Sequence, residues 1–327
     1  MKILVTGSSG HLGEALMRTL RARGDDVGGV DILPSPFTDH VGSIADRAFV
    51  ARCMEGVEAV LHTATLHKPH VATHSRQDFI DTNITGTLNL LEEAAARKVR
   101  AFVFTSTTSV FGDALVPPPG EPAAWITEDV VPAPKNIYGV TKTAAEDLCQ
   151  LFHRNHRVPC IVLRTSRFFP EPDDSKAARE AFDDTNLKVV EYLYRRVDIE
   201  DAVSAHLLAI ERAGDIGFGK YIISATTPFQ PSDLAALREH VPDVVRSYVD
   251  YEDVFAARGW RMPERLDRVY VNARARRDLG WAPKHDFASL IDGLRRGEDP
   301  VSPLARQVGI KGYHDEAYAD GLFPVES

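Results

Sequence analysis

Tyr138 and Lys142 lie four residues apart in the segment YGVTK and form a pair that could transfer a proton. On a helix, residues at this spacing share one face, so the ammonium group can approach the phenol ring. A free phenol has a pKa of about 10 and is a poor base at neutral pH unless nearby positive charge favours the phenolate. Lys142 would lower the pKa of Tyr138, which would then accept a hydroxyl proton. Such pairs are also frequent on ordinary helix surfaces, so the interpretation depends on the surroundings.

The segment TSTTSVFG supplies hydroxyl groups that can assist this proton transfer. It follows a short apolar run, and ligands of open α/β sheets bind at the carboxyl ends of strands. Thr107 is the predicted third catalytic member, which would hydrogen-bond the reacting oxygen. Ser106 and Thr108 are close enough in sequence to be mistaken for it, and Thr108 is a predicted substrate contact. At least two of these hydroxyls are expected to be ordinary turn residues.

Gly7, Gly10 and Gly13 follow the apolar run KILVT in a G-x-x-G-x-x-G spacing. Glycine lets the backbone turn tightly and lets a pyrophosphate approach the amide groups at a helix N-terminus. A glycine-rich turn can also be merely structural. The second apolar run ends at Asp31, where a carboxylate can accept both ribose hydroxyls of NAD. A 2′-phosphate would be repelled there, so the sequence predicts NAD rather than NADP as the cofactor. Lys142 would hold its ribose, and the oxidised nicotinamide ring would add a second positive charge that favours the Tyr138 phenolate.

These residues must be positioned by alternating strands and helices. Apolar runs of strand length are found at residues 3–5, 26–30, 59–62, 101–105 and 160–163. Between them, apolar residues recur at helical spacing, as in Leu12, Leu16 and Leu20 and again in Leu88, Leu91 and Ala95. This alternation predicts an α/β fold, a doubly wound parallel sheet of the Rossmann type, with a small C-terminal substrate lobe.

Proline marks the expected loops and the expected domain boundary. Residues 116–122 and 131–134 are Pro-rich and are predicted surface loops before a helix that starts near Tyr138. After Arg164 the regular alternation fails, and residues 168–186 are rich in proline and acidic residues. We therefore expect residues 1–166 with 195–226 to form an NAD-binding Rossmann domain. Residues 167–194 with 227–327 are expected to form the substrate lobe.

Composition argues against several other classes of protein. The 327 residues are 44% hydrophobic and carry a formal net charge of -9 without a basic stripe, which argues against nucleic acid as a partner. Cys53, Cys149 and Cys160 share no paired spacing and are expected to be free thiols. Neither a signal peptide nor a membrane-spanning segment is expected, so the predicted location is the cytoplasm.

Four histidines, His62, His67, His70 and His74, gather after the third apolar run. A metal site would need further ligands at suitable spacing, and no Asp, Glu or Cys supplies them, so no metal is predicted. The favoured interpretation is that one or two of these histidines, His67 in particular, contact the substrate.

In their order along the chain, these motifs resemble the extended short-chain dehydrogenases/reductases of the NAD-dependent epimerase/dehydratase family. The matching segments are VTGSSGHLG, NITGTLNLLEEA, FTSTTSVFG, ITED with YGVTK, DIEDAVSAHLLAIE and RRDLGWAPKHDF, which together span the chain to about residue 293. The resemblance implies an enzyme that forms a homodimer through the helices beginning near Asn83 and Tyr138. It implies cofactor contacts from Gly7, Gly10, His11, Leu12, Gly13, Asp31, Ser43, Ile44, Thr63, Ala64, Thr65, Asn83, Thr105, Tyr138 and Lys142.

Three positions depart from the family pattern. Ser43 replaces an acid at the adenine, and Thr107 replaces a serine but keeps the hydroxyl donor. Arg167, in LRTSRFFPEP, replaces an Asn that typically faces the nucleotide diphosphate, and the FPEP ending is similar to that of uronate dehydrogenases, which oxidise free sugar acids. Arg167 would bind an anionic group of the substrate through its planar fork. If Glu171 pairs with it instead, the arginine is structural.

The resemblance implies reversible hydride transfer at a secondary alcohol of a sugar or nucleotide sugar, as in epimerases and dehydratases. A dehydrogenase of a free sugar or sugar acid is one alternative. A non-catalytic NAD-sensing binding protein is another, and the intact Tyr138 and Lys142 pair argues against it. The net reaction, whether epimerisation, dehydration or oxidation, stays open at this point. The tail from Ser302 carries no chemical clue and would cover the lobe or a neighbouring chain.

Overall fold

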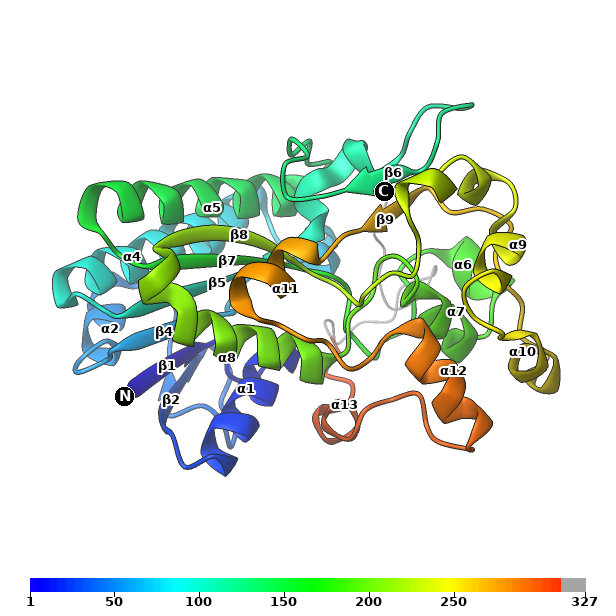
Figure 1. The fold of residues 1–327 in the computed structure, drawn as a ribbon. Coiled ribbons are helices and arrows are strands. Elements are labelled where there is room, and N and C mark those ends of the chain that lie inside the picture. The colour runs from blue at the N-terminus through cyan, green and yellow to red at the C-terminus, as the bar shows by residue number, and fades with distance from the viewer. Residues whose placement is uncertain (313–327) are drawn as a thin grey trace.

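A parallel sheet of seven strands forms the centre of the molecule (Figure 1). A computed structural model describes residues 1–312, and the strands are β1 (Lys2–Thr6), β2 (Asp26–Asp31), β3 (His40–Val41), β4 (Ala59–His62), β5 (Ala101–Thr107), β7 (Cys160–Thr165) and β8 (Phe218–Ile223). Their order is β3-β2-β1-β4-β5-β7-β8, and every neighbouring pair is parallel. The chain starts at β1 in the middle of the sheet, and the strand order reverses there, between β1 and β4. The predicted doubly wound α/β fold is confirmed.

Helices cover both faces of this sheet. α1 (His11–Ala22) and α8 (Ile199–Ile216) pack on one face, and α2 (Arg47–Cys53), α4 (Gly86–Arg97) and α5 (Ile137–His156) pack on the other. Figure 1 shows α1 and α8 on the opposite side of the strands from α5. Successive residues of a strand point to opposite faces, so β1 gives Ile3 and Val5 to one core and Leu4 to the other. Strands buried on both sides are apolar throughout, which explains the short continuous apolar runs in the sequence.

A second, smaller core lies beyond the carboxyl ends of the strands (Figure 1). Its helices are α7 (Asp184–Glu191), α9 (Val241–Arg246), α10 (Glu252–Arg258) and α12 (Phe287–Arg295). A two-stranded parallel sheet, β6 (Ala124–Ile126) with β9 (Arg268–Tyr270), borders this core and contributes Val269 to it. The sequence pattern did not indicate this small sheet.

Two helices within the range expected for the substrate lobe pack on the Rossmann part instead. α11 (Ala273–Leu279) and α13 (Pro303–Val308) contribute Leu279 and Val308 to the core shared by α1 and α8. Trp281 lies in the same core, and its indole nitrogen donates to the carbonyl of Asp201 at 3.1 Å. These helices correct the expected range 227–327, because helical periodicity does not tell which of two cores a helix covers. Most of the tail noted from Ser302 lies outside the described residues.

Short segments complete the connections between these elements. They are η1 (Lys68–Ala72), α3 (Arg76–Phe79), η2 (Ile80–Thr85), η3 (Thr108–Leu115), α6 (Lys176–Ala181), η4 (Pro231–Asp233) and η5 (Ala236–Arg238). η2 is a π-helical turn that runs directly into α4. The two Pro-rich stretches are loops on either side of β6, before α5, as predicted. Within the described part of the chain, the helices are too short or too polar to cross a membrane.

Candidate active site

The turn between β1 and α1 requires glycine for steric reasons. Gly7 has a φ of 72°, a left-handed value that favours glycine. A Cβ on Gly13 would lie 1.8 Å from the carbonyl oxygen of Gly7, and a Cβ on Gly7 would lie 2.7 Å from the nitrogen of Ala64. Gly10 is the N-cap of α1. The close approach of these backbones leaves the N-terminus of α1 as a cradle for an anion, which fits the pyrophosphate of a dinucleotide.

Asp31 lies beside this cradle at the end of β2. Its two carboxylate oxygens accept hydrogen bonds from the backbone nitrogens of Ser9 and Leu33, each at 3.0 Å. A carboxylate oxygen has a second acceptor position, so both oxygens can still accept ribose hydroxyls. Ser43 and Ile44 line the same end of the cavity. This arrangement fits the adenosine half of NAD.

The segment after β4 forms another wall of the site. Thr63, Ala64 and Thr65 line the cavity. The Thr63 hydroxyl donates to the carbonyl of Thr6 at 2.6 Å, and the nitrogen of Ala64 donates to the Thr6 hydroxyl at 3.2 Å. These bonds hold the wall against β1, so its position relative to the glycine turn is set by the sheet.

Asn83 lies behind this wall and does not line the cavity, although it was predicted as a cofactor contact. It is 2% exposed, and its amide group makes four hydrogen bonds. Its oxygen accepts from Thr65 and from the nitrogen of Leu66, and its nitrogen donates to the carbonyl of Leu66 and to Thr141. All donors and acceptors of the amide are therefore used. Asn83 thus holds the cavity wall in position from η2, and its amide has no hydrogen-bonding group left for a cofactor.

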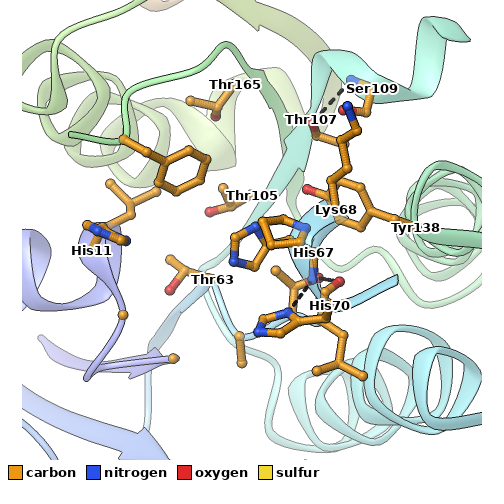
Figure 2. A pocket seen from close by; sticks show the side chains of 18 of the residues that line it. His11, Thr63, His67, Lys68, His70, Thr105, Thr107, Ser109, Tyr138 and Thr165 are labelled. Carbon is orange, nitrogen blue, oxygen red and sulfur yellow. Dashed lines mark hydrogen bonds between the residues drawn. The ribbon is translucent and has the colours of Figure 1, made fainter. Parts of the chain in front are cut away.

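One cavity of about 840 Å³ joins these groups to the predicted catalytic residues. Figure 2 shows Thr63, Thr105 and Tyr138 arranged around His67. The predicted site residues that line it are Gly7, Gly10, His11, Leu12, Gly13, Asp31, Ser43, Ile44, Thr63, Ala64, Thr65, His67, Thr105, Thr107, Thr108, Tyr138 and Arg167. Of the predicted set, Asn83 and Lys142 lie behind the wall.

α5 presents Tyr138 to the cavity beside Thr107. The helix begins at Ile137, and its N-cap Asn136 accepts from the nitrogen of Gly139 at 3.1 Å. Tyr138 and Thr107 both line the cavity, and the Thr107 side chain is close enough to influence the pKa of the Tyr138 phenol. The two residues predicted to act on the substrate hydroxyl thus lie at the same cavity, and their catalytic roles stay a prediction.

Lys142 lies one helical turn further, inside the protein. It is 2% exposed, and its Nζ lies 4.0 Å from the centre of the Phe104 ring. A cation over an aromatic face is attracted by the ring. The ammonium therefore sits directly behind the cavity wall that carries Tyr138, with the electrons of Phe104 on one side.

The protein's own groups leave Tyr138 protonated at neutral pH. Burial raises the pKa of Tyr138 to about 12, although the neighbouring Thr107 side chain opposes this shift. Burial lowers the pKa of Lys142 to about 7, although the charge of Glu146 opposes it. Lys142 thus loses its proton before Tyr138 does. Lys142 alone therefore does not offset the effect of burial on Tyr138. That Lys142, held by ribose hydroxyls, and an oxidised nicotinamide ring together favour the phenolate stays a prediction.

A buried ion-pair network lies next to Lys142 in the protein interior, and the sequence motifs did not predict it. Glu146 is fully buried and accepts from Nη2 of Arg164 at 2.7 Å and from the Ser106 hydroxyl at 2.6 Å. Lys220 lies 3.1 Å from the same carboxylate. Ser106 is therefore structural. The sequence contained one indication of this network: Glu146 lies four residues after Lys142, so the two side chains share a face of α5.

His206 of α8 is a second buried group that sequence reasoning missed. Its Nδ1 lies 2.7 Å from the carbonyl of Ala202, so Nδ1 carries the proton and Nε2 accepts from the Thr105 hydroxyl at 2.8 Å. Burial lowers the pKa of His206 to about 4. The neutral imidazole thus orients the hydroxyl of Thr105 at the cavity wall.

His67 is the predicted substrate contact that lies opposite Tyr138. The centres of the two rings are 6.4 Å apart, and His67 also stacks on Phe169 at 5.5 Å. His62 lies apart and is buried between the hydroxyls of Thr6 and Thr87. In the described residues, the side chains with ligand geometry are Asp198, Glu200 and His285, away from the cavity.

Arg167 lines the cavity, but carboxylates already match its charge. Its Nη1 lies 3.2 Å from Asp173 and 3.2 Å from Asp174. Glu171, the partner considered from the sequence, pairs with His11 instead, at 2.8 Å. The expected choice between a substrate anion and Glu171 is therefore corrected, because the loop folds back and supplies two other acids.

Glu171 is the centre of a clasp formed by His11, Glu14, Glu171 and Lys311. Besides His11, Glu171 accepts from the backbone nitrogen of Lys311 at 3.1 Å, and the Lys311 ammonium pairs with Glu14. Burial opposes the charge on Glu171, but the hydrogen bond and charge of His11 hold its pKa below the usual value. The clasp ties the glycine turn to the substrate lobe and to the C-terminal segment.

Known proteins are similar to this chain in sequence and in fold. Residues 3–223 match the NAD dependent epimerase/dehydratase family. A dTDP-glucose 4,6-dehydratase of Neisseria meningitidis serogroup B is 29% identical over 338 residues, covering 90% of this chain and 91% of that protein. A 3-beta-hydroxysteroid dehydrogenase of Mycolicibacterium neoaurum is 25% identical and covers 86% of this chain and 87% of that protein.

The fold is similar to that of a short-chain dehydrogenase/reductase superfamily protein from Agrobacterium tumefaciens, solved with bound NAD. The TM-score is 0.64 with 24% identity, and the match covers 91% of this chain and 98% of that chain. The family match extends over more than half of the chain and includes the glycine turn, Asp31, Thr107, Tyr138 and Lys142. The chain belongs to the NAD dependent epimerase/dehydratase family and is an enzyme that uses NAD.

Proposed function

We propose that the enzyme catalyses reversible hydride transfer between NAD and a secondary alcohol carbon of a sugar or nucleotide sugar. The observation that carries this proposal is the Tyr138 hydroxyl, which lines the cavity beside Thr107 with the Lys142 ammonium behind it. NAD supplies the hydride acceptor. Tyr138 takes the hydroxyl proton, Thr107 holds the reacting oxygen, and the product is a ketone.

The carboxylates of the cavity favour oxidation or epimerisation over dehydration. β-Elimination needs a general acid and base at the carbon next to the ketone. In the described residues, the acids that line the cavity are Asp31, Glu171 and Asp174. Asp31 belongs to the ribose end, and the other two are engaged by His11 and by Lys68, respectively. The residues after Thr107 bear hydroxyls, which are poor acids.

NAD-dependent oxidation of a free sugar or sugar acid is the second candidate. The segment of Phe169 and Glu171, which carries the similarity to uronate dehydrogenases, lies over the site. The Phe169 ring is 5.5 Å from that of His67 and 5.3 Å from that of His11. Phe169 and Glu171 line the cavity together with His67, so the segment similar to that of uronate dehydrogenases is in place to contact a substrate.

A substrate panel tests both candidates. The enzyme with NAD is incubated with UDP-glucose, dTDP-glucose, UDP-glucuronate, D-glucose and D-glucuronate. NADH release is followed by absorbance, and the sugars are analysed by NMR. We expect an oxidised or epimerised sugar from wild type and none from Tyr138→Phe. A dehydrated 4-keto-6-deoxy sugar would contradict the preference against elimination, and NAD binding without any turnover would support the NAD-sensing alternative.

We also propose a homodimer through α4 and α5. Val140 and Leu151 of α5 are 47% and 43% exposed, and Ile80, before α4, is 37% exposed. Positions 140 and 151 are about three helical turns apart and share one face. Light scattering after gel filtration should give twice the chain mass, and Val140→Asp with Leu151→Asp should give the monomer. A monomeric wild type would contradict this interface.

A cytoplasmic location is proposed from the cysteines. Cys53, Cys149 and Cys160 are buried free thiols. Unpaired thiols suit a reducing compartment. Cell fractionation of the tagged protein tests the location, and recovery from an oxidising compartment would contradict it.

A further inference from the structure

Six lysine and arginine side chains of the described residues line the cavity, and five of them pair with carboxylates. The five pairs are Lys68 with Asp174, Lys135 with Asp113, Arg167 with Asp173, Arg195 with Glu191 and Lys311 with Glu14. The sixth is Arg268, which forms no ion pair within residues 1–312. Its Nε is buried and has no hydrogen-bond partner there.

The strand β9 fixes Arg268 on the cavity wall. Its backbone pairs with Ala124 of β6, so the strand is held at one edge of the site. Arg268 and Tyr270 both line the cavity, because residues two apart on a strand share a face. The Tyr270 ring lies 6.4 Å from that of Phe111 in η3, the segment that follows Thr107. Arg268 therefore stands about 7 Å along β9 from a residue that packs on the catalytic segment.

We propose that Arg268 binds an oxyanion of the substrate, a carboxylate or a phosphate, and thereby selects anionic sugars. This assignment rests on the proposed function. A guanidinium fork matches two acceptor oxygens on one centre and binds them in a bidentate manner. A buried donor without a partner destabilises the protein unless a ligand satisfies it. Arg268 takes the role that the sequence suggested for Arg167, whose charge is already matched.

Two sources provide this chemistry, and the experiment separates them. A sugar acid offers a carboxylate, and a nucleotide sugar offers a diphosphate. Binding of D-glucuronate and of UDP to the NAD-loaded enzyme is measured by calorimetry for wild type, Arg268→Gln and Arg268→Lys. Arg265→Gln is the matched control, since Arg265 lies three residues away, is exposed and does not line the cavity. Thermal unfolding of each variant confirms that it folds.

We expect Arg268→Gln to raise the Kd of the recognised anion by about 10- to 150-fold, the loss typical of a charged hydrogen-bond pair. Arg268→Lys should lie between wild type and Arg268→Gln, and Arg265→Gln should match wild type. If Arg268→Gln weakens the binding of D-glucuronate alone, the site recognises a carboxylate. If it weakens the binding of UDP, the site recognises a phosphate. In turnover, the same variant should raise KM and change kcat little.

Calorimetry does not depend on turnover, so the two proposals can fail separately. If no sugar reacts but Arg268→Gln lowers the affinity for the anion, the proposed reaction is wrong and the anion site stands. If sugars react and Arg268→Gln binds both probes as wild type does, the anion site is wrong and the reaction stands. Failure of both probes to bind wild type would also overturn the role of Arg268.

Discussion

Replacing Lys142 by methionine should shift the pH dependence of hydride transfer without abolishing the reaction. Methionine keeps much of the length of the lysine stem and packs well against aromatic rings, and Nζ of Lys142 lies 4.0 Å from the centre of the Phe104 ring. The neighbouring carboxylate of Glu146 keeps Arg164 and Lys220 as partners. The fold should therefore survive, and the effect should be confined to the charge.

The size of the shift follows from the pKa of Tyr138, which burial raises to about 12. For a base that works near pH 8, that pKa must fall by about 4 units, or roughly 5 kcal/mol. One positive charge about 5 Å away contributes roughly 3 kcal/mol at an effective dielectric constant of about 20. The positive charge of oxidised NAD and the Lys142 ammonium are therefore both needed. Because burial lowers the pKa of Lys142 to about 7, the ammonium must be held by ribose hydroxyls of NAD to stay protonated near pH 8. Without the ammonium, the pKa of Tyr138 should rise by about 2 units.

The assay is the rate of NADH formation at saturating NAD and substrate over a wide pH range. The rising limb of Lys142→Met should lie about 2 pH units above that of wild type, with a rate about 100-fold lower at neutral pH. Tyr138→Phe is the matched control, and it should be slower by a factor of about 10² to 10⁴ at every pH while its NAD affinity stays nearly intact. An unshifted limb in Lys142→Met, or recovery of Tyr138→Phe at high pH, would refute the reasoning.

Four further substitutions test other parts of the structure. Asp31→Ala should narrow the preference for NAD over NADP by about 10-fold, because repulsion of a 2′-phosphate amounts to about 1 kcal/mol or more per charge at about 4 Å; an unchanged ratio in fluorescence titrations would contradict this. Gly13→Ala should weaken NAD binding and destabilise the fold by about 1–3 kcal/mol, since its Cβ would lie 1.8 Å from the oxygen of Gly7. Gly214→Ala, at an exposed helical position with open space, should be neutral or stabilising by up to about 1 kcal/mol in thermal unfolding, and an equal loss in both variants would argue against a steric cause. Burial lowers the pKa of His206 from 6.5 to about 4, so the unfolded chain binds more protons between these values and the free energy of unfolding should fall by about 2 kcal/mol from about pH 7 to pH 5. Burial also lowers the pKa of His62, so part of this pH dependence should remain in every variant. His206→Gln should lose about 2 kcal/mol of it in urea titrations, and a dependence equal to that of wild type would contradict the role of His206.

Features encoded within short segments could be predicted from the sequence. Gly7 and Gly13 lie in one turn, and Tyr138 and Lys142 lie one helical turn apart, so steric and periodic rules act directly on them. β3 could not be predicted in this way, because a strand of two residues is too short to show a periodic pattern. β8 contains Gly219 and a lysine, so its apolar run is too short to recognise as a buried strand.

Contacts between distant segments could not be predicted from local patterns. Arg268 is brought to the cavity by the pairing of β9 with β6, which are far apart in sequence. The partners of Arg167 depend on how the loop through Asp173 folds back. The order in which Lys142 and Tyr138 lose their protons depends on burial, which a motif does not report.

The clasp has a consequence for the way the enzyme is made. It joins Glu14 to Lys311, 297 positions along the chain. A ribosome releases the N-terminal turn first, and contacts across such a separation form late because closing a long loop is entropically unfavourable. The growing chain can thus build β1 and its glycine turn early, but the turn is tied down only after residue 311 has emerged. Tight capture of the cofactor should therefore begin only after residue 311 has been translated, and not on the nascent Rossmann half.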